Sequence, residues 1–136
     1  MSDATLEAIE ASLTMAAERA GDIVPAVFAR FFELSEAGTA LMAHSDLPMQ
    51  GRMFEGTVEM LLSAEALAPG GYLDWELDNH LTAYGATLPM YLDYLAAVRD
   101  TVQQACGADW SAAFAAAWDA RTGGIMARVE AFSERA

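Results

Sequence analysis

The sequence predicts an all-α fold of six main helices and one short third helix, in a single domain over residues 1–136. Three observations predict it. Apolar residues recur at helical spacing, no segment sustains the alternation typical of strands, and glycine or proline separates the helical stretches. A chain of 136 residues is also long enough to bury a sizeable core.

The first two helices are expected at about residues 5–20 and from Asp22 to about Phe32. Apolar residues occupy one face of the first helix, and Gly21 ends it. Asp22 is a typical N-cap, and Pro25 is tolerated in the first turn that follows. The second helix is apolar over much of its circumference, so we expect it to lie centrally.

A short helix is expected from Ser35 to Met42, followed by a loop. Asp46 is a typical N-cap for the next helix, and Pro48 suits its first turn. The inner face of that helix repeats at i, i+4, i+7 and i+8, in Phe54, Val58, Leu61 and Leu62. The helix is predicted to end before the proline-glycine breaker at residues 68–71.

The C-terminal half is predicted to form three further helices, at about residues 72–84, 89–106 and 111–132. One stripe of the first of these is formed by Leu73, Leu77, His80, Leu81 and Tyr84. The stripe of the last is formed by Phe114, Trp118, Ile125, Val129 and Phe132. Gly123 and Gly124 weaken the last helix by about 1 kcal/mol each, which suggests that another group approaches closely there.

The charge balance excludes some classes of partner. Twenty acidic residues and seven basic ones, all arginine, give a net charge of −13. Such a surface repels phosphate backbones and anionic headgroups, so nucleic-acid and membrane partners are not expected. The N-terminus has no signal-peptide pattern and no apolar run is long enough to span a bilayer, so a cytoplasmic location is expected. The lone Cys106 is expected to be a small buried hydrophobe.

His80 is the most informative residue for function. It lies between Leu77 and Leu81 on an apolar stripe, where a histidine is more often a core residue than a metal ligand. Neutral imidazole nevertheless ligates iron in many haem proteins. One ring nitrogen of His80 can face iron while the other donates to a carbonyl about one turn back, near Glu76. The second histidine, His44, is expected to be exposed in its loop.

Four short stretches between Asp22 and Phe132 carry a family resemblance. They are residues 27–32 (VFARFF), residues 49–54 (MQGRMF), Asn79-His80 followed by Tyr84-Gly85, and Ala117-Trp118. Their order and spacing resemble the globin superfamily, most closely bacterial single-domain globins and the haem domain of flavohaemoglobins. The interval of 30 residues from Gln50 to His80 is also similar to that of the family. The resemblance implies a globin fold, a three-over-three helical sandwich, with haem b as cofactor.

The resemblance also implies roles for single residues. His80 would be the proximal iron ligand, and Gln50 would be the distal residue that donates an amide hydrogen bond to bound dioxygen. The further haem contacts would be Phe28, Met42, Phe54, Tyr84 and Tyr91. Arg52 and Arg99 are candidates to pair with the haem propionates, although a surface role is favoured for both.

Three departures from the family pattern bear on these roles. Met42 stands where the family has phenylalanine, and its thioether is soft enough to ligate iron. One extra residue separates His80 from Tyr84, which implies an altered turn. Thr122 stands where flavohaemoglobins have a tyrosine that supports the proximal histidine. Flavin and nicotinamide domains are missing from the sequence, so any reductase is expected to be a separate protein.

Three functions are compatible with the sequence. The expected one is reversible binding of dioxygen, carbon monoxide or nitric oxide at haem iron held by His80, as in oxygen binding or transport. A haem-free globin-like sensor or partner-binding module is the alternative, favoured by Met42 and by the absence of lysine. Haem-dependent detoxification of nitric oxide or peroxide is third. Peroxidase chemistry needs a distal acid–base group, which Gln50 is not, so an enzyme is the less expected outcome.

Overall fold

The computed structural model describes residues 3–63, 65, 71, 73 and 86–135, with side chains as far as residue 132. Within these residues the chain forms six α-helices and no strand, which confirms the all-α prediction for this part. The helices are α1 (Asp3–Ala20), α2 (Val24–Leu34), α3 (Glu36–Leu41), α4 (Leu47–Leu62), α6 (Leu88–Cys106) and α7 (Ala112–Arg135), with a short 3-10 helix, η3 (Gly107–Asp109), before α7. Of the helix expected at residues 72–84, only Leu73 is described, and it is buried.

Short polar side chains and prolines begin several helices, as the sequence predicts. Ser35 and Asp46 cap α3 and α4, each accepting a backbone N–H three residues further on, at 2.8 and 2.9 Å. Proline occupies the first turn of α2, α4 and α6. At α2 the N-cap lies one residue later than predicted. Ile23 is the N-cap there, and the Asp22 carboxylate accepts the N–H of Val24 at 3.0 Å.

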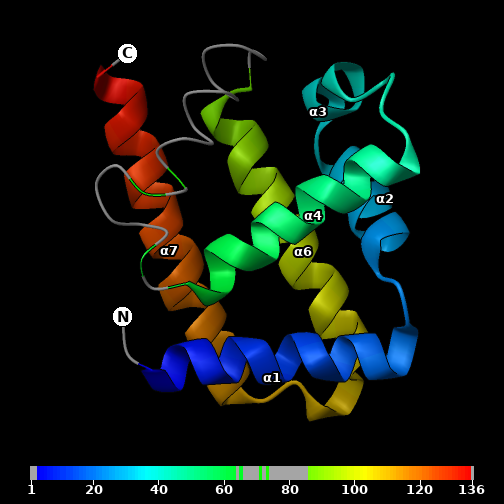
Figure 1. Cartoon of the computed structure of the whole chain (residues 1–136), viewed down its shortest axis with the longest axis vertical. Coiled ribbons are helices and arrows are strands. Elements are labelled where there is room, and N and C mark those ends of the chain that lie inside the picture. Colours follow the sequence, from blue (N-terminus) through cyan, green and yellow to red (C-terminus); the bar gives the residue numbers. More distant parts are fainter. Residues whose placement is uncertain (1–2, 64, 66–70, 72, 74–85, 136) are drawn as a thin grey trace.

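Helix α6 is the centre of the arrangement. Helices α1, α2 and α7 all pack against it, and α3 packs against α2. Figure 1 shows α1 lying across the lower ends of α6 and α7. Helix α4 crosses in front of α6 in this view and packs against α1 and α2. This crossing leaves room for a cavity between α4 and α6, which is described below.

The apolar core confirms the central position expected for α2 and most of the stripe expected for α7, of which Phe114 and Phe132 are only partly buried. Val27, Phe28 and Phe31 of α2 are at most 5% exposed, as expected for a central helix. The α7 residues Trp118, Ile125 and Val129 are fully buried. No close approach occurs at Gly123, because a Cβ built there would have no neighbour within 4 Å.

A small polar cluster joins α1, α6 and α7 inside this core. Trp118 Nε1 donates to Ser12 Oγ at 2.9 Å, and this hydroxyl donates in turn to the Ile9 carbonyl at 2.7 Å. The Cys106 thiol contacts the Ser12 carbonyl at 3.6 Å. Burial raises the pKa of Cys106, so the thiol stays protonated at neutral pH and behaves as the buried hydrophobe expected from the sequence.

The buried stripe of α7 includes one charged residue, Arg121, which is only 1% exposed. Its Nη2 donates to the carbonyls of Met60 at 2.6 Å and Ser63 at 2.5 Å. Both carbonyls lie at the C-terminal end of α4, where a positive charge also complements the helix dipole. Desolvation lowers the pKa of Arg121, but its ordinary value is so high that the guanidinium remains charged. Arg121 therefore ties the end of α4 to α7.

Gly38 allows α3 to approach α2 closely. A Cβ built on Gly38 would lie 2.3 Å from Cζ of Phe31, far inside van der Waals contact. The Phe31 ring is held between Phe28 and Tyr94, with centroid distances of 6.5 and 5.5 Å. The ring therefore cannot move aside without disturbing its neighbours.

We expect Gly38→Ala to lower the free energy of unfolding by about 1–3 kcal/mol, because the added methyl group overpacks the contact with Phe31. Urea denaturation measures this change. Gly123→Ala in α7 is the matched control, since its Cβ would meet open space. The control should raise the free energy of unfolding by about 0.5–1 kcal/mol. Equal effects of the two substitutions would contradict the close contact.

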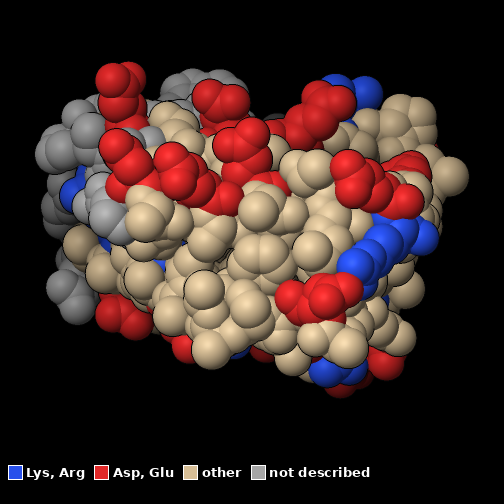
Figure 2. Space-filling view, turned by 90° about the horizontal axis from the view of Figure 1, so that it is seen from below, with Lys and Arg blue, Asp and Glu red and all other residues tan. Residues whose placement is uncertain are grey.

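The described surface is strongly acidic. Figure 2 shows acidic side chains spread over the face seen from below, with few basic side chains among them. Three of the described arginines form ion pairs on the surface. Arg19 pairs with Asp109 and Arg99 with Asp119, whereas Arg30 pairs with both Glu33 and Asp100. None of the described helices combines the length and apolar character needed to cross a membrane.

Candidate functional site

A cavity of about 510 Å³ lies among α2, α3, α4, α6 and α7. Cofactor and ligand sites commonly have volumes of about 300–1,000 Å³, so this cavity is large enough for one. Apart from the α4 side, its walls are formed by Phe31, Leu41, Met42, His44, Ser45, Ala86, Met90, Tyr91, Tyr94, Leu95 and Ile125. Most of these side chains are apolar or aromatic, as is typical of sites for large apolar ligands.

Helix α4 contributes the longest wall. The residues that it places there are Met49, Arg52, Met53, Gly56, Thr57 and Met60. They follow the spacing i, i+3, i+4, i+7, i+8 and i+11, which is one continuous stripe on a helix. A neighbouring face of α4 carries Leu61, which is fully buried in the core. Helix α4 therefore has one face for the core and another for the cavity.

Methionine is the most frequent residue in the cavity wall. Five of the eight methionines of the chain line it: Met42, Met49, Met53, Met60 and Met90. Methionine side chains are flexible and polarizable, so they adapt to the outline of an apolar ligand. Their thioether sulfurs are also soft ligands for transition metals. The wall thus offers both packing surface and metal-ligating atoms.

The hydroxyl groups in the wall are engaged with the protein. Thr57 Oγ1 donates to the Met53 carbonyl at 2.9 Å. The Tyr94 hydroxyl lies 2.9 Å from the same Oγ1 and donates to it, because the hydrogen of Thr57 is already used. The Tyr94 ring is fixed by Phe28 and Phe31, at centroid distances of 5.7 and 5.5 Å. This part of the wall is therefore rigid.

Polar side chains gather at the mouth of the cavity. Arg52 and His44 line the cavity and are exposed to solvent. Leu41 and Met49 beside them are 42% and 43% exposed and add apolar surface at the mouth. No salt bridge within the described part of the chain uses Arg52. The Arg52 guanidinium can therefore pair with an anionic group on a ligand in the cavity.

The structure brings only some of the residues predicted to contact haem to the cavity wall. Met42 and Tyr91 line the cavity. The predicted proximal ligand His80 and the predicted contact Tyr84 lie outside the described residues. His44, expected to be exposed in a loop, is exposed and also lines the cavity mouth.

The other three predicted contacts are described but do not line the cavity. Gln50 is 9% exposed, and its Nε2 donates to Ser45 Oγ at 2.9 Å, so it lies behind a wall residue. Phe28 is 1% exposed and packs against Phe31, which does line the cavity. Phe54 is partly buried against the core. Their contacts with haem remain predictions.

The two arginines considered for haem propionates differ in position. Arg52 lies at the cavity, as described above. Arg99 pairs with Asp119 of α7, and its guanidinium lies 6.0 Å from the centroid of the Trp110 ring. Trp110 and Arg99 are not among the residues that line the cavity. For Arg99 a surface role is therefore favoured, as the sequence suggested.

Sequence reasoning did not select most residues of the cavity wall, among them Met49, Met53, Met60 and Tyr94. A signal for three of them was present, because these methionines recur at i, i+4 and i+11 along α4. The face that contains Phe54 was chosen instead, since its leucine and valine residues form the more regular apolar pattern. For Tyr94, only the folded structure reveals the contact with Thr57.

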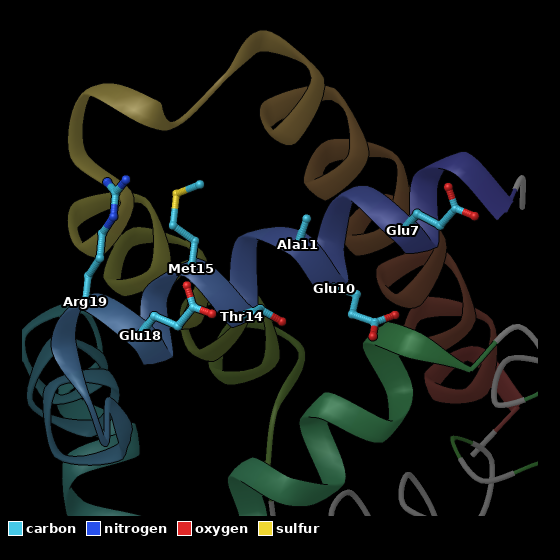
Figure 3. A pocket seen from close by; sticks show the side chains of 7 residues that line it. All are labelled: Glu7, Glu10, Ala11, Thr14, Met15, Glu18 and Arg19. Atoms are coloured by element: carbon cyan, nitrogen blue, oxygen red, sulfur yellow. The ribbon is translucent and has the colours of Figure 1, made fainter.

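A second depression lies along α1 and is shown in Figure 3. It is lined by Glu7, Glu10, Ala11, Thr14, Met15, Glu18 and Arg19, all from this one helix. Arg19 already pairs with Asp109 and donates to the Cys106 carbonyl at 2.6 Å. The described residues contain no group of three histidine, cysteine, aspartate or glutamate side chains that could hold a metal ion, here or elsewhere. This depression is therefore an ordinary acidic helix surface.

Comparisons of this chain with protein-family models, with curated proteins and with solved structures gave no match. The cavity and the sequence therefore carry the function proposed below.

Proposed function

We propose that this chain is a haem-binding globin with a three-over-three helical sandwich, and that it binds dioxygen or another diatomic gas reversibly. The observation that carries the proposal is the apolar cavity of about 510 Å³ between α4 and α6. A porphyrin is a large apolar disc with two acid groups at one edge. The cavity matches both properties, because its walls are rich in methionine and aromatic side chains and its mouth carries Arg52.

The chain's own residues would hold the haem in the following way. Phe31, Tyr91 and Tyr94 offer flat apolar surfaces, and the methionines fill the remaining space around the disc. Arg52 at the mouth would pair with a propionate, with His44 as a second polar partner. Exclusion of water by these walls would strengthen every polar contact inside the cavity.

His80 is the proposed proximal ligand. It lies six positions before Ala86, which lines the cavity, so the chain between them spans at most about 20–22 Å. His44 is the only other histidine in the sequence. Haem iron held by one imidazole supplies an open coordination position at which a diatomic gas can bind. The other ring nitrogen of His80 would donate its N–H to a backbone carbonyl. This hydrogen bond would fix the tautomer and leave the opposite nitrogen free to face the iron.

The experiment is a hemin titration of the purified chain, followed by absorption spectroscopy. We expect a saturable Soret band, and a shifted band when carbon monoxide is added to the reduced protein. His80→Ala should lose the ligated spectrum, whereas the matched control His44→Ala should keep it. A protein that gives no saturable Soret band, or a His80→Ala variant with an unchanged spectrum, would overturn the proposal.

A haem-free binding module is the second candidate. It is favoured by the exposure of Leu41 and Met49 at the mouth, because methionine-rich exposed surfaces often bind apolar partners. Thermal denaturation separates the two functions. Specific haem binding to the folded chain raises the melting temperature as hemin is added, whereas a haem-free module shows no dependence on hemin concentration.

A further inference from the structure

The residues that α4 places in the cavity wall differ from those expected at an oxygen-binding site. Gln50, the predicted distal hydrogen-bond donor, is engaged with Ser45 and does not line the cavity. The α4 stripe that does line it places thioethers there, at Met49, Met53 and Met60. Thioethers donate no hydrogen bond, but they are soft metal ligands.

The position of Met53 distinguishes it from the other two. Met49 lies in the first turn of α4 and is 43% exposed at the mouth, and Met60 lies in the last turn and is part of the buried core. Met53 lies between them and is partly buried. If haem occupied the cavity, Met53 would be the thioether of this stripe nearest the middle of the wall.

Two neighbours of Met53 support this position. Gly56, three residues further along the same stripe, also lines the cavity and has no side chain. The Met53 carbonyl accepts the Thr57 hydroxyl at 2.9 Å, and Tyr94 donates to that hydroxyl. The helix turn that carries Met53 is therefore fixed from the α6 side.

We propose that Met53 Sδ is a displaceable sixth ligand of the haem iron in this cavity. The inference rests on the proposed haem binding. A gas molecule binds only when the bond between Sδ and iron breaks, so ligand exchange involves no change of oxidation state. A neutral thioether ligand would also favour reduced iron, as in cytochromes. The site would therefore favour the ferrous form, which binds these gases, once an electron donor has reduced it.

The test compares the hemin-loaded full chain with Met53→Leu and with two matched controls outside this cavity wall, Met15→Leu and Met126→Leu. Leucine has a similar volume, so the fold and the Soret band should be retained in all three. The oxidised unaltered protein and both controls should show the near-infrared sulfur-to-iron charge-transfer band, and Met53→Leu should lack it. Reduced Met53→Leu should bind carbon monoxide about tenfold more tightly if Sδ occupies the iron for about nine tenths of the time.

The outcomes separate this inference from the function on which it rests. If the unaltered protein gives no Soret band, both are overturned. A Soret band without the sulfur band, or a sulfur band that persists in Met53→Leu, overturns the role of Met53 alone. A six-coordinate spectrum that is lost in His44→Gln would assign the sixth position to His44 and would likewise overturn it.

Discussion

Replacement of Trp118 by alanine is expected to lower the free energy of unfolding by about 3–5 kcal/mol. Trp118 is fully buried and is the largest such side chain in the described part of the chain. Its loss would leave a cavity where α1, α6 and α7 meet, and Ser12 would lose the indole N–H that it accepts at 2.9 Å. Single domains are stable by only about 5–15 kcal/mol, so this loss would be a large part of the total.

Trp118→Phe separates the two contributions. It keeps an aromatic ring in the core but removes the N–H, while Ser12 Oγ still donates to the Ile9 carbonyl. We expect a smaller loss, of about 1–2 kcal/mol. Urea denaturation followed by circular dichroism measures both variants without relying on tryptophan fluorescence. If the two variants were equally destabilised, the contribution of packing would be contradicted.

The helices themselves were largely predictable because their signals are local. Ser35 and Asp46 cap the helices that follow them, and the prolines in the first turns stand where the sequence expects a start. A cap or a proline acts on its own turn of backbone, so three or four neighbouring residues contain the whole signal. The N-cap predicted at Asp22 lies one residue before the observed N-cap, Ile23, and an error of this size is expected from such local signals.

The cavity was less predictable because a helix face is sensitive to register. Neighbouring positions on a helix are about 100° apart, so an error of one residue exchanges a lining residue for one at the edge. Gln50 and Met49 illustrate this: Met49 lines the cavity, and Gln50 contacts Ser45 instead. Helix α4 also has two apolar faces, and the sequence does not say which of them meets the core.

Arg121 shows a second limit of sequence reasoning. It falls on the buried stripe of α7, three residues after Trp118 and four before Ile125, so its spacing alone predicts a buried charge. A buried charge needs partners, but its partners here are carbonyls about 60 residues earlier in the chain, at Met60 and Ser63. Only the packing of α4 against α7 brings these groups together.

Arg121→Met is therefore expected to lower the free energy of unfolding by about 3 kcal/mol. The substitution keeps most of the volume but leaves the carbonyls of Met60 and Ser63 without the donor that now binds them. Arg121→Lys should be intermediate, because an ammonium keeps the charge but cannot reproduce the planar donor group of arginine. Arg30→Met is the control. Arg30 pairs with Asp100 at the surface, where an ion pair contributes about 0–1 kcal/mol.

The same substitution connects the core to the proposed haem site. Met60 belongs both to the α4 end that Arg121 holds and to the cavity wall. Loosening of α4 at this end would leave the whole stripe from Met49 to Met60 less well positioned. Hemin should therefore bind Arg121→Met more weakly than it binds the unaltered chain. Trp118 does not line the cavity, so Trp118→Phe should bind hemin with unchanged affinity as long as it is folded. Equal hemin affinities for Arg121→Met and Trp118→Phe would mean that Arg121 stabilises the fold without positioning the α4 wall.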